Sequence, residues 1–256
     1  MPTSNKNKII LDLCGGTGAW SKPYLEAGYT VYNITLPKYD VLATRIVEND
    51  RSRCFHFRKD TNDNYRLVIP IRKVYGILSA PPCTMFSFAR TKAKKPRDLE
   101  EGFEVVRACL DIIWSCMEIQ QDTRHKTLPL KFWALENPNG MLKYFLGKPA
   151  FEFDPWEFGD EYKKKTYLWG WFSEPKKKFE KIEDVMAKEQ IEKHKTNSPK
   201  LPVFNPYKSL NPRLQKKFDR LASREIAPEM FGKLTRQERR AITPAGFAKA
   251  FFECNQ

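Results

Sequence analysis

The stretch SAPPCTMFSFAR, residues 79–90, places a cysteine directly after two prolines. The prolines restrict the backbone, so the Cys83 thiol is positioned with little conformational freedom left to lose. A lone cysteine is commonly a small structural residue. Cys83, however, follows an apolar run and shares its loop with Phe86 and Phe88. This setting weakens the structural interpretation, and both a structural and a functional role stay open on this motif alone.

A carboxylate follows a second apolar run. Glu136 leaves the segment FWAL, residues 132–135, and begins the sequence ENPNG. Partial desolvation raises the pKa of a carboxyl group toward the range useful for proton donation. Glu136 could equally cap a turn. Both interpretations stay open on this motif alone.

A glycine-rich segment, DLCGGTGAW at 12–20, follows a third apolar run. The spacing D-x-x-x-G-x-G between a strand and a helix lets the backbone approach a cofactor closely, although a turn without a ligand would also use glycine. A dinucleotide site would show G-x-G-x-x-G and an acid about 20 residues later. Here Ser21 occupies the sixth position, and residues 33–35 contain no carboxylate. The pattern favours an adenosyl ligand without a pyrophosphate, such as S-adenosylmethionine.

Strands and helices alternate along the chain. Helices are expected from Ser21 to Gly28, over 98–121, where apolar residues keep helical spacing, and near the C-terminus. This order predicts an α/β fold with a doubly wound, mostly parallel sheet, whose ligands bind beyond the carboxyl ends of the strands. The predicted strands are 8–13, 29–36, 39–42, 74–79, 131–137 and 166–172.

The chain divides into three parts by composition. Residues 1–172 form the predicted catalytic and cofactor-binding core, in which 43–73 are polar and are interpreted as an irregular insertion. Residues 173–237 are rich in Lys, Pro and Asn and predict a small basic lobe. Residues 238–256 predict a helix that returns to the core.

Charge and cysteine usage narrow the function classes. The chain carries 45 Lys and Arg against 31 Asp and Glu, a formal net charge of +14, which suits a polyanionic partner such as nucleic acid or simply keeps the surface solvated. The six cysteines include no C-x-x-C pair, so no metal site is expected. We expect neither a signal peptide nor a membrane span, and a cytoplasmic location.

Four motifs occur in one order: the glycine turn, PPC followed by FS, the EN pair, and the terminal ITPAGFAKAFFECN. This series resembles the ordered motifs of the cytosine-5 DNA methyltransferases, particularly the compact bacteriophage type, over Ile9 to Asn255. The PPC loop followed by the EN pair is the specific part. The resemblance implies a class I S-adenosylmethionine-dependent, Rossmann-like methyltransferase fold.

The resemblance also implies a mechanism. Cys83 would add to carbon 6 of a cytosine flipped out of double-stranded DNA, Glu136 would assist at ring nitrogen 3, and Asn137 would shape the turn. Lys164 stands at an arginine position of the family's Gln-x-Arg-x-Arg segment. Contacts to S-adenosylmethionine are expected from Asp12, Cys14, Gly15, Gly16, Thr17, Gly18, Trp20, Thr35, Asp40, Pro81, Thr243 and Pro244. Contacts to DNA are expected from Ser87, Arg90, Lys163, Lys165, Arg239 and Arg240.

The sequence departs from the family pattern at several positions. Cys14 replaces the usual Phe, the acid after the second strand is absent, and Lys164 lacks the bidentate fork of arginine. The triplet 163–165 could alternatively contact phosphate only. Because the basic lobe is short, we expect a short or relaxed target sequence, a monomer, and, by resemblance, evasion of restriction in a host cytoplasm. A tRNA cytosine-5 methyltransferase and a catalytically silent DNA-binding module remain alternatives.

Overall fold

The computed structural model describes residues 5–49, 52–59, 66–88, 90, 94–121, 130–160, 162–181, 184–185 and 232–256. Its centre is a six-stranded sheet of order β2-β1-β6-β7-β9-β8. The first four strands of this order are parallel, β9 is antiparallel to β7, and β8 is antiparallel to β9. The predicted mostly parallel α/β fold is therefore confirmed. The strands are β1 (Ile9–Leu13), β2 (Thr30–Ile34), β6 (Val74–Ser79), β7 (Phe132–Pro138), β8 (Phe151–Phe153) and β9 (Thr166–Trp171).

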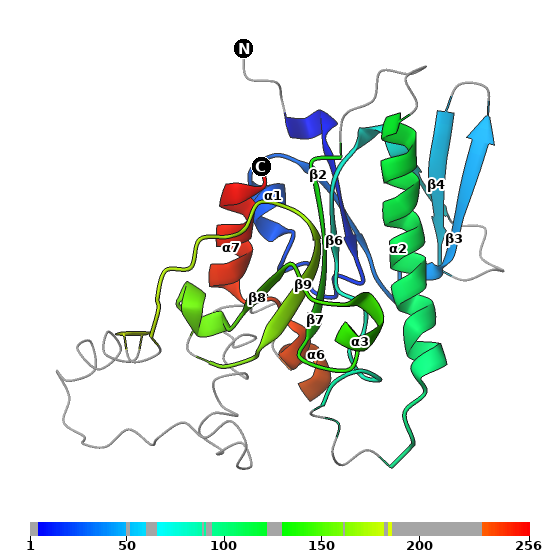
Figure 1. Cartoon of the computed structure of the whole chain (residues 1–256). Coiled ribbons are helices and arrows are strands. Elements are labelled where there is room, and N and C mark those ends of the chain that lie inside the picture. The colour runs from blue at the N-terminus through cyan, green and yellow to red at the C-terminus, as the bar shows by residue number, and fades with distance from the viewer. Residues whose placement is uncertain are drawn as a thin grey trace.

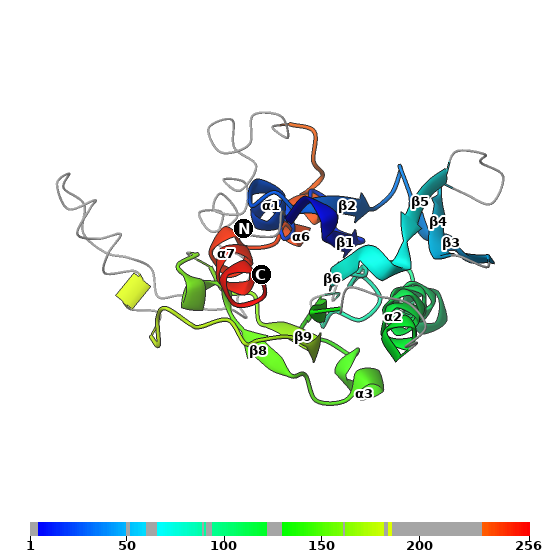
Figure 2. The same cartoon turned by 90° about the horizontal axis from the view of Figure 1, so that it is seen from above.

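Helices cover both faces of this sheet. The short α1 (Lys22–Glu26) and the C-terminal α7 (Ala245–Cys254) lie on one face, and the long α2 (Leu99–Gln121) lies on the other (Figures 1 and 2). Two short helices, α3 (Lys143–Leu146) and α6 (Arg236–Ala241), lie near the lower edge of the sheet in Figure 1. Three 3-10 turns complete the described elements: η1 (Asn5–Asn7), η2 (Ile71–Lys73) and η3 (Pro155–Phe158).

Local sequence signals explain where the helices begin and end. Asp98 accepts a hydrogen bond from the Glu101 amide at 2.9 Å, which confirms the expected start of α2. Gly28 has φ +83° and follows the end of α1. Ser21 precedes α1 as expected, but it makes no cap bond. Its hydroxyl instead donates to the Asp12 carboxylate at 2.5 Å.

The interpretation of residues 43–73 as an irregular insertion is wrong. They belong to a second, three-stranded antiparallel sheet of order β3-β4-β5, in which the segment expected at 39–42 is the start of its first strand. Its strands are β3 (Asp40–Asn49), β4 (Ser52–Arg58) and β5 (Arg66–Pro70).

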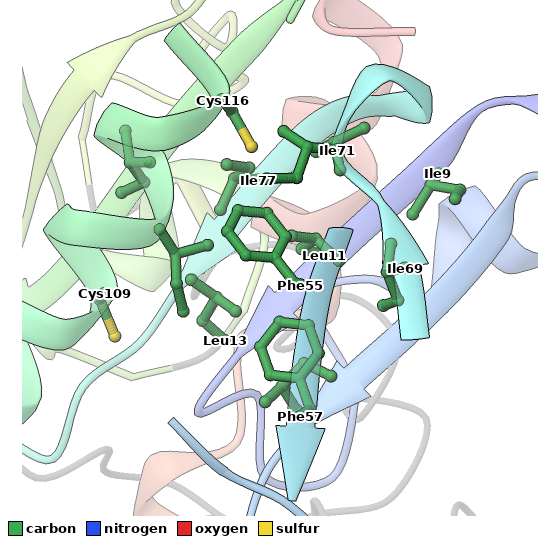
Figure 3. Packing of buried hydrophobic residues seen from close by; sticks show 14 of the residues in the cluster. Ile9, Leu11, Leu13, Phe55, Phe57, Ile69, Ile71, Ile77, Cys109 and Cys116 are labelled. Carbon is green, nitrogen blue, oxygen red and sulfur yellow. The ribbon is translucent and has the colours of Figure 1, made fainter. Parts of the chain in front are cut away.

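The second sheet is part of the main hydrophobic core. Phe55, Phe57 and Ile69 are fully buried and join the cluster that includes Leu11 of β1 and Cys109 of α2 (Figure 3). In β4 these aromatic residues alternate with polar ones, so about half of β4 is polar even though one face is buried.

The opposite face of the central sheet has an aromatic core. Phe247 of α7 stacks on Phe153 with ring centroids 4.0 Å apart and also contacts Trp20 and Phe158. The Tyr24 hydroxyl donates to the Asn255 carbonyl at 3.1 Å. These contacts fix the C-terminal helix α7 on the core.

Most of the predicted basic lobe, 173–237, lies outside the described residues. Among the residues that are described, no helix is long and apolar enough to cross a membrane. The described part of the chain also holds no group of His, Cys, Asp and Glu side chains suited to a metal ion.

Candidate active site

The three predicted motifs lie at the carboxyl ends of three neighbouring parallel strands, β1, β6 and β7, and therefore meet at one edge of the sheet. Two hydrogen bonds join them: the Ala80 amide donates to the Leu13 carbonyl at 2.9 Å, and the Asn137 side-chain amide donates to the Pro81 carbonyl at 3.0 Å. Asn137 is fully buried. The EN pair is thus attached to the PPC loop, as the sequence order suggests.

Cys83 sits in a tight turn at this edge. Its carbonyl accepts hydrogen bonds from the amides of Phe86 at 3.0 Å and Ser87 at 2.8 Å. The thiol is partly buried, and this burial raises its pKa. Lys164 and Arg240 oppose that rise in the pKa and Glu136 adds to it, so all three charged groups act on the sulfur.

Glu136 and Lys164 form an ion pair beside this thiol. The Lys164 Nζ lies 3.6 Å from the Glu136 Oε1, and the two side chains are 21% and 16% exposed, respectively. At this separation, the attraction is about 4–5 kcal/mol for an effective dielectric constant near 20, before desolvation is counted. A carboxylate, an ammonium group and a thiol together can bind a polar heterocycle and move a proton at its ring.

Backbone contacts between the loop after β6 and the loop after β7 fix the position of Cys83 relative to Glu136. Ser87 forms an isolated β-bridge with Gly140, and the Met141 amide donates to the Phe86 carbonyl at 2.8 Å. A Cβ atom at Gly140 would lie 2.4 Å from the same carbonyl oxygen, so only glycine fits here without a shift. Arg97, which the sequence motifs did not single out, donates to the carbonyls of Met85 and Ser87, each at 2.8 Å.

The glycine turn is strained in a way that brings backbone close to the site. Cys14, Gly16 and Gly18 all have positive φ, at 56°, 55° and 74°. Asp12 is fully buried beneath the turn, and a Cβ atom at Gly15 would lie 2.3 Å from its carboxyl group. Burial raises the pKa of Asp12 to about 6, although the Ser21 hydrogen bond acts in the opposite direction.

Two features of this turn suit a bound small molecule. Nothing lies within 4 Å of a Cβ atom placed on Gly16, so the turn is open there. The buried Asp12 Oδ1 has no hydrogen-bond partner, and its charge would favour a cation above the turn. Asn33 donates to the Gly16 carbonyl at 3.0 Å and holds the open side in place. The sequence motifs did not single out Asn33.

Other predicted cofactor residues have different environments. Trp20 is 1% exposed and packs against Phe247 and Phe251, so a cofactor would not reach its ring. Cys14 shares a hydrogen bond with the Cys109 thiol, and this bond, together with burial, raises its pKa and keeps it a neutral thiol. Asp40 accepts the Leu42 amide at 3.0 Å. Half-exposed positions are found for Thr17, Thr35 and Thr243, whereas Pro81 and Pro244 are buried.

A carboxylate that no sequence motif indicated contacts the start of α7. Asp160 accepts the Gly246 amide at 3.1 Å, and the amides of Ala245 and Phe247 also act on it. Burial nevertheless raises the pKa of Asp160 to about 6. Because Asp160 is 86 residues from Gly246 along the chain, only the fold reveals this contact.

The predicted DNA-contacting residues have different environments in the structure. Arg90 and Arg239 donate to backbone carbonyls of their own loops, and Lys165 pairs with Glu152 at 2.9 Å. Arg240 is exposed, and its charge reaches Cys83. Half-buried positions are found for Ser87 and Lys163.

The chain was also compared with known proteins. No protein-family model and no curated sequence matches it.

Proposed function

We propose that this protein is a DNA (cytosine-5) methyltransferase that uses S-adenosylmethionine. One observation carries the proposal: Cys83 lies within the electrostatic reach of the Glu136–Lys164 pair, at a sheet edge that also bears an open glycine turn. A nucleophile, a proton-holding carboxylate and a cofactor turn are the three parts that methylation of cytosine carbon 5 requires.

The residues perform the chemistry in a defined order. The Cys83 thiol gives its proton to solvent, and the thiolate adds to carbon 6 of an extruded cytosine while ring nitrogen 3 takes a proton from Glu136, which becomes a carboxylate. Lys164 stabilises the Glu136 carboxylate and would also attract the negative charge that develops on the cytosine ring. Once carbon 5 carries its methyl group, the proton on carbon 5 passes to solvent, the proton on ring nitrogen 3 returns to Glu136, and the double bond between carbons 5 and 6 re-forms. The bond between sulfur and carbon 6 breaks as this double bond forms, and the thiolate is released.

The cofactor proposal follows from the turn. S-adenosylmethionine, when bound, supplies an electrophilic methyl group. Gly16 leaves room for close approach, and the negative charge of Asp12 beneath the turn would attract the sulfonium and ammonium groups. Asn33 holds the Gly16 side of the cradle. Asp12 itself acts through the turn, because its side chain is fully buried.

Trapping on 5-fluorocytosine tests the mechanism. Fluorine at carbon 5 cannot leave as a proton, so elimination stalls and a covalent protein–DNA adduct accumulates in the presence of S-adenosylmethionine. We expect a denaturation-resistant adduct with the wild type and none with Cys83→Ser. Cys254→Ser is the matched control, since Cys254 is exposed at the end of α7 and should leave the adduct intact. An adduct that persists in Cys83→Ser would exclude this mechanism.

Substrate class is tested with the same enzyme. Labelled methyl groups should pass to duplex DNA and not to transfer RNA at equal cytosine content; the reverse preference would favour the RNA enzyme. Bisulfite sequencing of DNA from a methylation-free host that expresses the protein should show a two- to three-base site or many contexts. One strict six-base site would contradict relaxed recognition.

A further inference from the structure

Three exposed aromatic side chains gather next to the Cys83 turn. Phe88 is 45% exposed, Tyr144 is 71% exposed, and Phe145 is 51% exposed. Phe88 follows the PPC loop directly, and the other two lie on α3, which Figure 1 shows at the lower edge of the sheet. A large exposed apolar surface beside a polar site usually marks a place where a partner binds.

The patch rests on a rigid support. Phe145 contacts the ring of Phe103 on α2, with centroids 5.5 Å apart, and that of the fully buried Phe86 at 6.3 Å. The bridge between Ser87 and Gly140 ties the two loops together. These contacts fix the backbone of α3 and of the loop that carries Phe88, so the positions from which Phe88 and Tyr144 project are set before a ligand binds.

The ammonium group of Lys143 lies near the rings of both Phe88 and Tyr144. The Lys143 Nζ is 5.8 Å from the centroid of Phe88 and 5.4 Å from that of Tyr144. An aromatic surface interleaved with a cation matches a nucleobase joined to a phosphate.

The charge of the two segments points to the same partner. Residues 79–97 contain five Lys and Arg residues, residues 137–150 contain two, and neither segment contains an Asp or a Glu. Lys94 and Lys95 are exposed. A protein partner would require only the apolar rings, whereas a polyanion with planar bases uses both the rings and the charge.

We propose that Phe88, Lys143 and Tyr144, called here the stacking patch, bind an unpaired DNA base next to the target cytosine, with Lys143 contacting its phosphate. This inference rests on the proposed function and deepens it. The protein then engages a short unpaired or distorted stretch of DNA rather than a single extruded base in an intact duplex. Single-stranded DNA without cytosine should therefore bind to the patch independently of any chemistry at Cys83.

Fluorescence anisotropy with two labelled oligonucleotides tests the patch. One is a twelve-nucleotide thymidine strand, and the other is an abasic strand with the same number of phosphates. We expect Tyr144→Ala and Phe88→Ala to weaken thymidine-strand binding about 5- to 100-fold, and to leave abasic-strand binding unchanged. Trp114→Ala is the matched control, because Trp114 is 66% exposed on α2 and lies outside the patch. Its binding should equal that of the wild type.

The remaining outcomes separate this inference from the proposed function. Lys143→Gln should lower the salt dependence of binding to both strands, by a slope of about 0.7 for one lost phosphate contact on a single strand. Wild-type affinity for the thymidine strand in both aromatic variants, or an equal loss on the abasic strand, overturns the stacking patch even where the fluorocytosine adduct forms. If the aromatic variants lose binding to the thymidine strand but the wild type forms no fluorocytosine adduct, the stacking patch is supported and the methyltransferase proposal is refuted.

Discussion

Replacing Asp12 by Asn should change how the stability of the protein depends on pH. Asp12 is fully buried, its Oδ1 has no partner, and Ser21 gives it one hydrogen bond. Burial raises its pKa from 3.8 to about 6 in the folded protein. That difference corresponds to about 3 kcal/mol of folding free energy.

The sign follows from proton uptake. Between pH 3.8 and about 6 the folded protein keeps a proton that the unfolded chain has released, so the unfolding free energy falls as the pH rises through this window. Above it, the ionised Asp12 destabilises the fold by the full amount. An Asn side chain does not titrate. The unfolding free energy of Asp12→Asn relative to that of the wild type should therefore increase by about 2.4 kcal/mol from pH 4 to pH 7.5.

Urea unfolding at several pH values measures this difference without activity. Asp111→Asn serves as the control, because it makes the same chemical change at an exposed position on α2 and should run parallel to the wild type. If Asp12→Asn and the wild type also stay parallel over this range, Asp12 is not a buried, strained carboxylate and the reasoning fails. Binding of S-adenosylmethionine should weaken in Asp12→Asn, as measured by calorimetry at pH 7.5.

Three further changes are informative. Glu136→Gln should slow adduct formation about 100- to 10,000-fold, yet speed alkylation of Cys83 by iodoacetamide near pH 8, because the lost negative charge no longer raises the thiol pKa; slower alkylation would contradict the placement of these groups. Gly140→Ala should cost about 1–3 kcal/mol of unfolding free energy, since its Cβ would lie 2.4 Å from the Phe86 carbonyl oxygen, and urea melts that match the wild type would refute the tight loop contact. Phe55→Ala should cost about 3–5 kcal/mol in the same assay; a loss below about 1 kcal/mol would place the second sheet outside the core.

The sequence predicts five of the six strands of the central sheet because these five are short apolar runs. It misses β8, which has only three residues and a glutamate at its centre. The order of the strands then brings Cys83 and Glu136 to one edge. The same rule misses the second sheet, because in β4 the buried Phe55 and Phe57 alternate with polar residues. A period of two in a half-polar segment is the signal that could have revealed it.

The site shows a similar division. The order of the motifs predicts that Cys83 and Glu136 lie at the same sheet edge. It does not predict contacts that depend on tertiary packing. Arg97 holds the Cys83 turn through two backbone carbonyls, and Asp160 meets the start of α7 across 86 residues. The pattern also assigned Trp20 to the cofactor, although its indole completes the aromatic core. Motif spacing identifies neighbours along a strand end, whereas tertiary packing decides which side chains face the site.

Burial opposes the ionisation of Asp12, Cys83 and Asp160, as it also does for Cys116 and Tyr24 in the two cores. The pKa values of Asp12 and Asp160 are both raised to about 6, and burial also raises the pKa of the Cys83 thiol. At a functional site, such a stability cost can be retained because a ligand removes it. The two carboxylates differ in how far the fold already compensates them. Asp160 receives amides from the start of α7, whereas Asp12 interacts with the hydroxyl and the backbone of Ser21 and keeps an unpartnered oxygen. A cation bound over Gly16 would offset that cost at Asp12. The instability of the empty turn and its affinity for a positively charged cofactor would then have the same physical origin.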